Sequence, residues 1–105
     1  MVMEVQDMET IRSGDVLVDF YTSTCGPCKM MNPVLDEISE QFSNLKVAKI
    51  EVTKNPEASR MFGVMSVPTL IFLRDSKVRE VSRGFLDKNK LVAFVKKNLN
   101  GHAKE

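Results

Sequence analysis

A strand pattern and a helix pattern meet in the sequence VLVDFYTSTCGPC at residues 16–28. Residues 16–21 are β-branched, aromatic or otherwise apolar on both faces except for Asp19, which is typical of a strand that helices cover on both sides. The residues after Cys25 have helical spacing instead, with an apolar stripe at Met31, Leu35, Ile38 and Phe42. The stretch therefore predicts a central strand followed by an amphipathic helix.

The rest of the chain continues this alternation of strands and helices. Further strands are predicted at residues 1–5, 45–52, 69–73 and 77–83, and further helices at residues 8–12, 56–62 and 87–99. Asn55 and Asp87 are the expected N-caps of the last two helices, and Asp75-Ser76 is the expected turn of a hairpin. The pattern predicts an α/β fold in a single domain of residues 1–105, with a central mixed five-stranded sheet flanked by helices on both faces.

Composition and charge disfavour several classes of function. The 105 residues include 15 Lys and Arg against 14 Asp and Glu, a net charge of +1, so no basic field for nucleic acid or anionic membrane is expected. Residues 1–7 lack the basic and apolar regions of a signal peptide, and no apolar run is long enough to cross a membrane. We expect a cytoplasmic protein.

The two cysteines of the chain, Cys25 and Cys28, lie three residues apart at the start of the predicted helix. Helical geometry places their Cα atoms ~5 Å apart, within the range of a disulfide. The helix N-terminus favours the thiolate of Cys25, because unpaired N–H groups and partial positive charge gather there. Cys25 is therefore the predicted nucleophile, and the deeper Cys28 is the predicted resolving thiol.

Two other interpretations of the cysteine pair remain. The pair could be half of a zinc site or an inert buried pair. Zinc usually needs four ligands, and the chain offers only one histidine, His102, in a tail that looks loose. We expect no metal site and a solvated His102.

The motif and its surroundings resemble the thioredoxin family. The resemblance runs from residues 16–20 through Cys25-Gly26-Pro27-Cys28 to Val67-Pro68-Thr69 and Gly84, and covers nearly the whole chain. A lone C-x-x-C would be weak, but its place between a strand and a helix, with Val-Pro-Thr forty residues later, is specific. The resemblance implies the thioredoxin fold and a reducing cysteine pair; thioredoxin is itself a standard example of a C-x-x-C thiol with a lowered pKa and a reducing potential.

Asp19 and Lys49 are candidate residues for proton transfer. An acid in an apolar central strand either finds solvent at the strand end or is buried, and burial would raise its pKa and make it a proton acceptor. The resemblance implies that Asp19 lies beneath Cys28 and helps to deprotonate it, with Lys49 beside it. Lys49 could partly neutralise Asp19 or be an ordinary surface lysine.

The resemblance also implies a docking surface and a cis peptide bond before Pro68, although a trans bond is the default for proline. The backbone of Val67 would then be free to pair with an extended substrate segment. The residues implied to bind substrate around Cys25 are Gly26, Pro27, Val67, Pro68 and Gly84.

The predicted function is a general dithiol reductant of protein disulfides, which acts through a mixed disulfide and carries no bound cofactor. The chain has no nucleotide-binding signature, so a thioredoxin reductase is implied as the partner of a monomeric protein. The alternatives are an oxidant or isomerase, and a non-catalytic interaction module. Thr24 and Tyr21 stand where the family usually has tryptophans, so Met65 is the predicted substitute contact, with a buried core methionine as the alternative.

Overall fold

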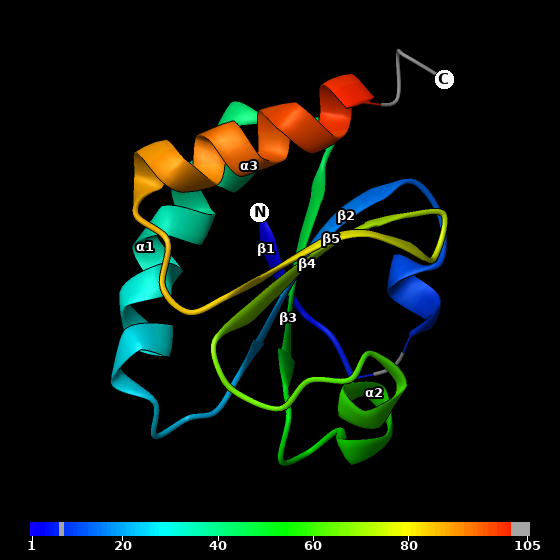
Figure 1. The fold of residues 1–105 in the computed structure, drawn as a ribbon, viewed down its shortest axis with the longest axis vertical. Helices are drawn as coiled ribbons and strands as arrows, with labels where there is room; N and C mark the ends of the chain where they lie inside the picture. Colours follow the sequence, from blue (N-terminus) through cyan, green and yellow to red (C-terminus); the bar gives the residue numbers. More distant parts are fainter. Residues whose placement is uncertain (7, 102–105) are drawn as a thin grey trace.

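A five-stranded mixed sheet forms the centre of the computed structural model, which describes residues 1–6 and 8–101 (Figure 1). In spatial order the strands are β1 (Val2–Glu4), β3 (Lys46–Glu51), β2 (Asp15–Tyr21), β4 (Thr69–Arg74) and β5 (Lys77–Arg83). The first three strands are parallel to one another, whereas β4 is antiparallel to both β2 and β5. The predicted central position of the first long strand and the edge position of the last are both confirmed.

Helices cover both faces of the sheet, as predicted. The helical elements are a short 3-10 helix (Glu9–Ile11), α1 (Gly26–Gln41), α2 (Pro56–Met61) and α3 (Lys88–Gly101). Figure 1 shows α1 and α3 close together at the upper left, well away from α2. None of the helices within the described residues is long and apolar enough to span a membrane.

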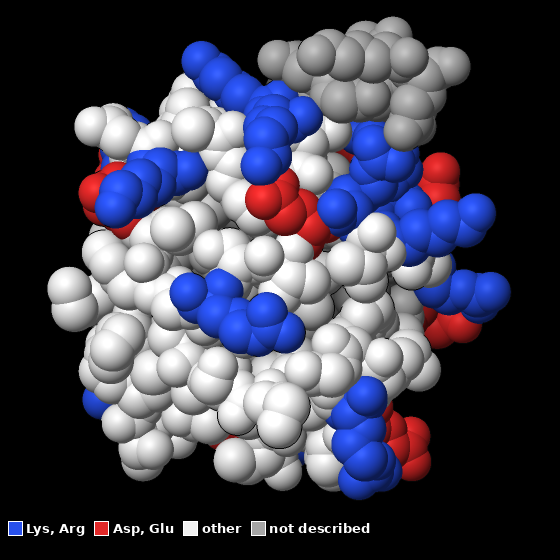
Figure 2. Space-filling model, viewed as in Figure 1, with Lys and Arg blue, Asp and Glu red and all other residues white. Residues whose placement is uncertain are grey.

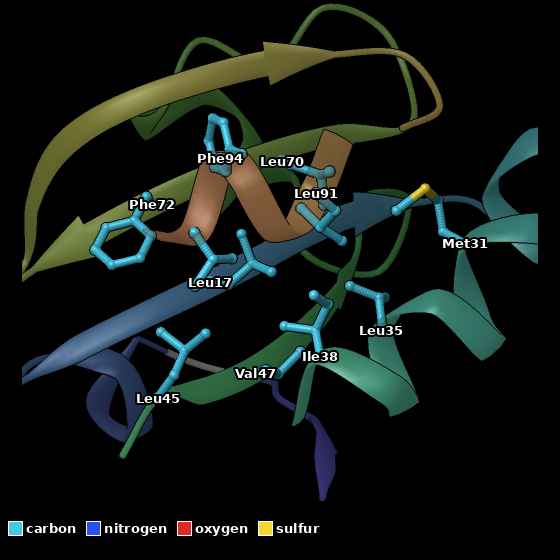
Figure 3. Close-up of a cluster of buried hydrophobic side chains, with 11 residues drawn as sticks. Leu17, Met31, Leu35, Ile38, Leu45, Val47, Leu70, Phe72, Leu91 and Phe94 are labelled. Carbon is cyan, nitrogen blue, oxygen red and sulfur yellow. The ribbon is translucent and has the colours of Figure 1, made fainter. Parts of the chain in front are cut away.

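The alternation of side chains along β2 separates two hydrophobic clusters. Leu17 packs with Met31 and Leu35 of α1 and with Leu91 of α3 in the cluster drawn in Figure 3. Val16, Val18 and Phe20 point to the opposite face, where they pack with residues from α2 and its C-terminal end. Because side chains alternate along a strand, Asp19 shares the Leu17 face, which α1 and α3 cover.

Several local predictions can be compared with the structure. The Asp75-Ser76 turn is confirmed, with φ values of 51° and 72°, and the Asp87 carboxylate accepts a hydrogen bond from the Lys90 N–H at the start of α3. Asn55 is the N-cap residue of α2, as predicted, but its side chain makes no capping bond, and its amide N–H donates to the Glu51 carbonyl. His102 lies outside the described residues.

Candidate active site

The cysteine pair joins the end of the central strand to the first long helix. β2 ends at Tyr21, and Cys25 is the N-cap of α1, which begins at Gly26 and carries Cys28 in its first turn. The two cysteines form a disulfide with Cα atoms 5.2 Å apart, close to the predicted separation. The Cys28 backbone N–H donates a hydrogen bond to Cys25 Sγ at 3.1 Å. The Cys28 N–H at the start of the helix therefore faces the first sulfur.

The two sulfur-bearing residues differ in exposure. Cys28 is only 2% exposed, whereas Cys25 is partly exposed at the mouth of the site. An incoming disulfide can therefore approach Cys25 but not Cys28. The predicted difference in depth between the two cysteines is confirmed.

Asp19 is a fully buried carboxyl on the sheet face that α1 covers. Its exposed fraction is 0%, and neither of its carboxylate oxygens has a hydrogen-bond partner within the described residues. Burial raises the pKa of Asp19 from 3.8 to about 7, while the positive charge of Lys49 lowers it and the negative charge of Glu4 raises it. The alternative of a solvated acid at the strand end is wrong.

Lys49 lies beside Asp19, but its hydrogen bond goes elsewhere. The two residues are register partners on β3 and β2, so their side chains leave the same face of the sheet. The Lys49 ammonium donates to Asn32 Oδ1 at 2.6 Å and lies 4.3 Å from the centroid of the Tyr21 ring. Lys49 is thus a half-buried neighbour of Asp19, not a free surface lysine. Our sequence prediction missed the part played by Asn32, although its place one turn after Cys28 was a signal.

The predicted substrate-binding residues come from three chain segments at one end of the sheet. Antiparallel pairing sets Thr69 opposite Phe20, so the preceding Val67-Pro68 lies where β2 runs on toward Cys25. The cis peptide bond between Val67 and Pro68 is confirmed. Gly84 follows the last residue of β5, and its N–H donates to the Pro68 carbonyl at 2.8 Å. The loop of Pro68 and the loop of Gly84 are therefore tied together, while Gly26 and Pro27 lie exposed on the α1 side.

The surface around the cysteines has little charge and exposes apolar side chains. Met65 is 92% exposed and Phe85 is 39% exposed, so the alternative of Met65 as a core residue is wrong. Met65 lines a surface pocket of about 430 Å³, whose walls also include Thr22, Val64 and Val67. The lower left of Figure 2, over the loops that precede α1 and β4, is almost free of charged side chains. Exposed apolar side chains of this kind are typical of surfaces that contact another molecule.

Metal chemistry finds no support among the residues that the structure describes, because no three His, Cys, Asp or Glu side chains cluster there. The reactive centre is instead a cysteine pair that can open and close on one helical turn. A buried carboxyl lies on the same side of the sheet, covered by the helix that carries the deeper cysteine. This fold and this site define a thiol-disulfide oxidoreductase.

Comparisons with known proteins identify the family. The thioredoxin family model matches residues 3–97. The chain is 47% identical to a thioredoxin of Bacillus subtilis over 87 residues, which cover 82% of this chain and 84% of that one. It is 42% identical to a thioredoxin of Listeria monocytogenes over 101 residues, which cover 92% and 98% of the two chains.

A solved structure gives the same result for the fold. A mutant thioredoxin of Halobacterium salinarum superposes with a TM-score of 0.86 at 32% identity, and the match covers 92% of this chain and 89% of that one. The chain belongs to the thioredoxin family. It is a thiol-disulfide oxidoreductase with protein-disulfide reductase activity.

Proposed function

We propose that Cys25 is the nucleophile and Cys28 the resolving thiol in the reduction of protein disulfides. The thiolate of Cys25 attacks one sulfur of the substrate disulfide, a Cys25-substrate disulfide forms, and the other substrate sulfur leaves as a thiolate. Cys28 then attacks Cys25 Sγ, which forms the Cys25–Cys28 disulfide and releases the second substrate thiolate. Two electrons pass from the cysteine pair to the substrate. The observation that carries this assignment is the 2% exposure of Cys28 behind a reachable Cys25.

Asp19 is the proton acceptor for Cys28 in this proposal. A thiol attacks only as the thiolate, so the Cys28 proton must leave before the resolving step. Burial raises the pKa of the Asp19 carboxyl to about 7, so it can accept a proton near neutral pH, and neither of its oxygens has a hydrogen-bond partner among the described residues. Lys49 supplies the positive charge that keeps part of the Asp19 population ionised.

The substrate-binding surface in this proposal combines Gly26 and Pro27 with the Val67-Pro68 loop and Gly84. The half-buried Val67 supports a role in pairing its backbone with an extended segment of the substrate. The small residues on the α1 side leave Cys25 open to a bulky partner. Met65 extends this surface into the neighbouring pocket.

The electrons come from an external partner. Because the reaction leaves Cys25 and Cys28 oxidised, a thioredoxin reductase must return two electrons for each turnover. A dithiol reductant works only in a compartment that is kept reducing, which favours the cytoplasm. We expect the chain to act as a monomer and a single domain, without nucleic acid or membrane as a partner and without a resident cofactor.

The test is an insulin-reduction assay with dithiothreitol as electron donor, run on the wild type, Cys25→Ser and Cys28→Ser. We expect the wild type to accelerate insulin precipitation and both variants to fail. In a separate reaction of the reduced protein with insulin after dithiothreitol has been removed, Cys28→Ser should accumulate a mixed disulfide through Cys25, which mass spectrometry detects, because no resolving thiol remains. Wild-type turnover no better than that of Cys25→Ser would favour a non-catalytic module, and a mixed disulfide found only in Cys25→Ser would reverse the roles.

A further inference from the structure

Four polar side chains share one face of the sheet beside the cysteine-bearing helix. Strand register aligns Asp19 of β2 with Lys49 of β3, and Lys49 with Glu4 of β1. Tyr21 follows Asp19 by two residues, so it lies on the same face. α1 covers this face and brings Asn32, one helical turn after Cys28, to the Lys49 side chain. Lys49 is therefore the centre of the cluster.

Two contacts hold the Lys49 ammonium in place. It donates to Asn32 Oδ1 at 2.6 Å, and it lies over the Tyr21 ring at 4.3 Å. The ring is itself fixed, because the Tyr21 hydroxyl donates to Glu4 Oε1 at 2.7 Å. Asp19, the register partner of Lys49, receives no hydrogen bond at either oxygen from the described residues. The cation thus binds a neutral amide and an aromatic face in preference to the buried carboxyl beside it.

We propose that Asn32 is a positioning residue that, with the Tyr21 ring, holds the Lys49 ammonium away from the Asp19 carboxylate, so that Asp19 keeps enough proton affinity to take the Cys28 proton. This inference rests on the proposed role of Asp19 as proton acceptor. It assigns to Asn32 and Tyr21 a role in setting the proton affinity of Asp19, which the proposed function does not itself give them.

The physical reason is that Asn32 and the Tyr21 ring compete with Asp19 for the Lys49 ammonium. A direct contact between an ammonium and a carboxylate strongly favours the ionised acid, and a carboxylate stabilised in that way is a poor base. The charge-assisted bond to Asn32 uses one of the donors of Lys49 and fixes its position, and the ring face attracts the same cation. While the contacts with Asn32 and the Tyr21 ring are made, the Lys49 ammonium affects Asp19 only electrostatically, without a hydrogen bond to it.

The other groups around Asp19 do not supply a positive charge that could take the place of Lys49. β4 places the apolar Leu70 opposite Asp19, and α1 contributes Cys28, which is uncharged in the disulfide. The titratable groups that face this cluster include Glu4 of β1, Tyr21 of β2, Lys49 and Glu51 of β3, and Cys28 and Asp36 of α1. Lys49 is the one cation among them, so its position decides how strongly the ionised form of Asp19 is favoured.

The test measures the Asp19 carboxyl directly in the oxidised protein, where neither cysteine titrates. Carbon NMR of protein labelled at Asp carboxyls follows the Asp19 signal from pH 4 to pH 9 in the wild type and Asn32→Ala. We expect Asn32→Ala to move the Asp19 titration to lower pH by about one pH unit, because the released ammonium can reach within the ~4–6 Å at which an opposite charge acts strongly. Asn32→Asp, which keeps an acceptor for the ammonium, should not show this downward movement.

A second background separates an effect through Lys49 from a general disturbance. In Lys49→Met the same Asn32→Ala change should leave the Asp19 titration unmoved, because no cation remains to be released. An unchanged or upward titration in Asn32→Ala would overturn the proposal, as would an equal downward movement in the Lys49→Met background. The acid limb of the pH profile for mixed-disulfide resolution should move with the titration. If the Asp19 titration moves as expected but the pH profile does not, the positioning of Lys49 by Asn32 is supported. Asp19 is then rejected as the proton acceptor for Cys28.

Discussion

The backbone N–H of Cys28 donates to the sulfur of Cys25 across 3.1 Å, so the first cysteine caps the helix that carries the second. The cap needs no other side chain, because the sulfur itself occupies the position where a serine or aspartate oxygen usually accepts the bond. When the disulfide opens, the same N–H and the helix dipole face a thiolate. The geometry thus favours ionisation of Cys25 and does nothing comparable for Cys28.

The first prediction is an asymmetry in alkylation of the reduced protein. Cys25 should react with iodoacetamide near neutral pH well before Cys28, because Cys25 is both more exposed and better stabilised as a thiolate. Peptide mass mapping after a short treatment measures the two rates. Labelling that begins at Cys28 would contradict the assignment of the nucleophile.

The second prediction is that Asp19→Asn stabilises the oxidised protein in a pH-dependent way. Below pH ~4 the Asp19 carboxyl is protonated in both the folded and the unfolded state, so the variant gains nothing from removing the charge. Between pH ~4 and 7 the unfolded chain loses its proton first, because burial raises the folded pKa from 3.8 to about 7, and the wild type loses stability. Above that range the variant should be more stable by on the order of 4 kcal/mol.

Chemical denaturation at pH 4, 5.5 and 8 checks this dependence. Asp36→Asn serves as the matched control, because Asp36 is an exposed acid on α1. The control should change stability by less than ~0.5 kcal/mol at every pH. The same Asp19→Asn variant should resolve mixed disulfides more slowly than the wild type. A stability difference that stays constant with pH would mean that Asp19 is not the group that titrates.

The third prediction assigns partner contact to Met65. Met65→Ala should raise KM for protein disulfides roughly fivefold, which corresponds to about 1 kcal/mol of lost contact, and should leave a small disulfide such as cystine little affected. Because Met65 is 92% exposed, the variant should keep the stability of the wild type. Steady-state kinetics on insulin and on cystine provide the comparison.

Thr24→Trp provides the complementary variant for the Met65 prediction. A tryptophan at the residue before Cys25 offers a broad apolar face, so in the Met65→Ala background it should partly restore the KM for insulin. Equal losses on insulin and cystine in Met65→Ala would show that Met65 affects the cysteines rather than the partner.

The fourth prediction separates the strain of a glycine replacement from its effect on the site. Gly84 and Gly14 both have positive φ, at 94° and 79°, and neither has an atom within 4 Å of where a Cβ would lie. Gly84→Ala and Gly14→Ala should therefore each cost about 1–2 kcal/mol from backbone strain alone. Only Gly84→Ala should also raise KM for protein disulfides, because Gly14 precedes β2 at the opposite end from the cysteines. Equal KM effects would remove Gly84 from the docking surface.

The arrangement of strands and helices could be predicted because its signals are local. The apolar run of β2, the stripe of α1 and the turn at Asp75-Ser76 each depend on neighbouring residues, and all three were found within a residue or two of their predicted limits. The cysteine chemistry could be predicted for the same reason, since both cysteines lie on one helical turn. The apolar residues on either side of Asp19 left burial and solvation at the strand end as alternatives, and the structure decides for burial.

Other features depend on residues that meet only after folding. The Asn55 side chain can accept from a helix N–H through its oxygen or donate through its N–H to a nearby carbonyl; it donates to Glu51, and propensity alone does not predict which bond forms. Lys49 was predicted beside Asp19, but its bond to Asn32 joins β3 to α1 across 17 residues of sequence. The exposure of Met65 was likewise undecided, because a loop methionine is compatible with either a core or a surface.

Because both cysteines lie on a single turn of one helix, with Cα atoms 5.2 Å apart, exchange between the dithiol and the disulfide requires little movement of the backbone. The outer shape offered to a partner is then nearly the same before and after turnover. The oxidised and reduced forms would compete for the same targets with similar affinity. The enzyme that reduces the protein would likewise bind both forms. The direction of electron transfer would come from the chemistry of the sulfur atoms and the supply of electrons, not from selective release of the oxidised protein by its targets. An excess of oxidised protein would therefore act as a competitive inhibitor of the reduced form.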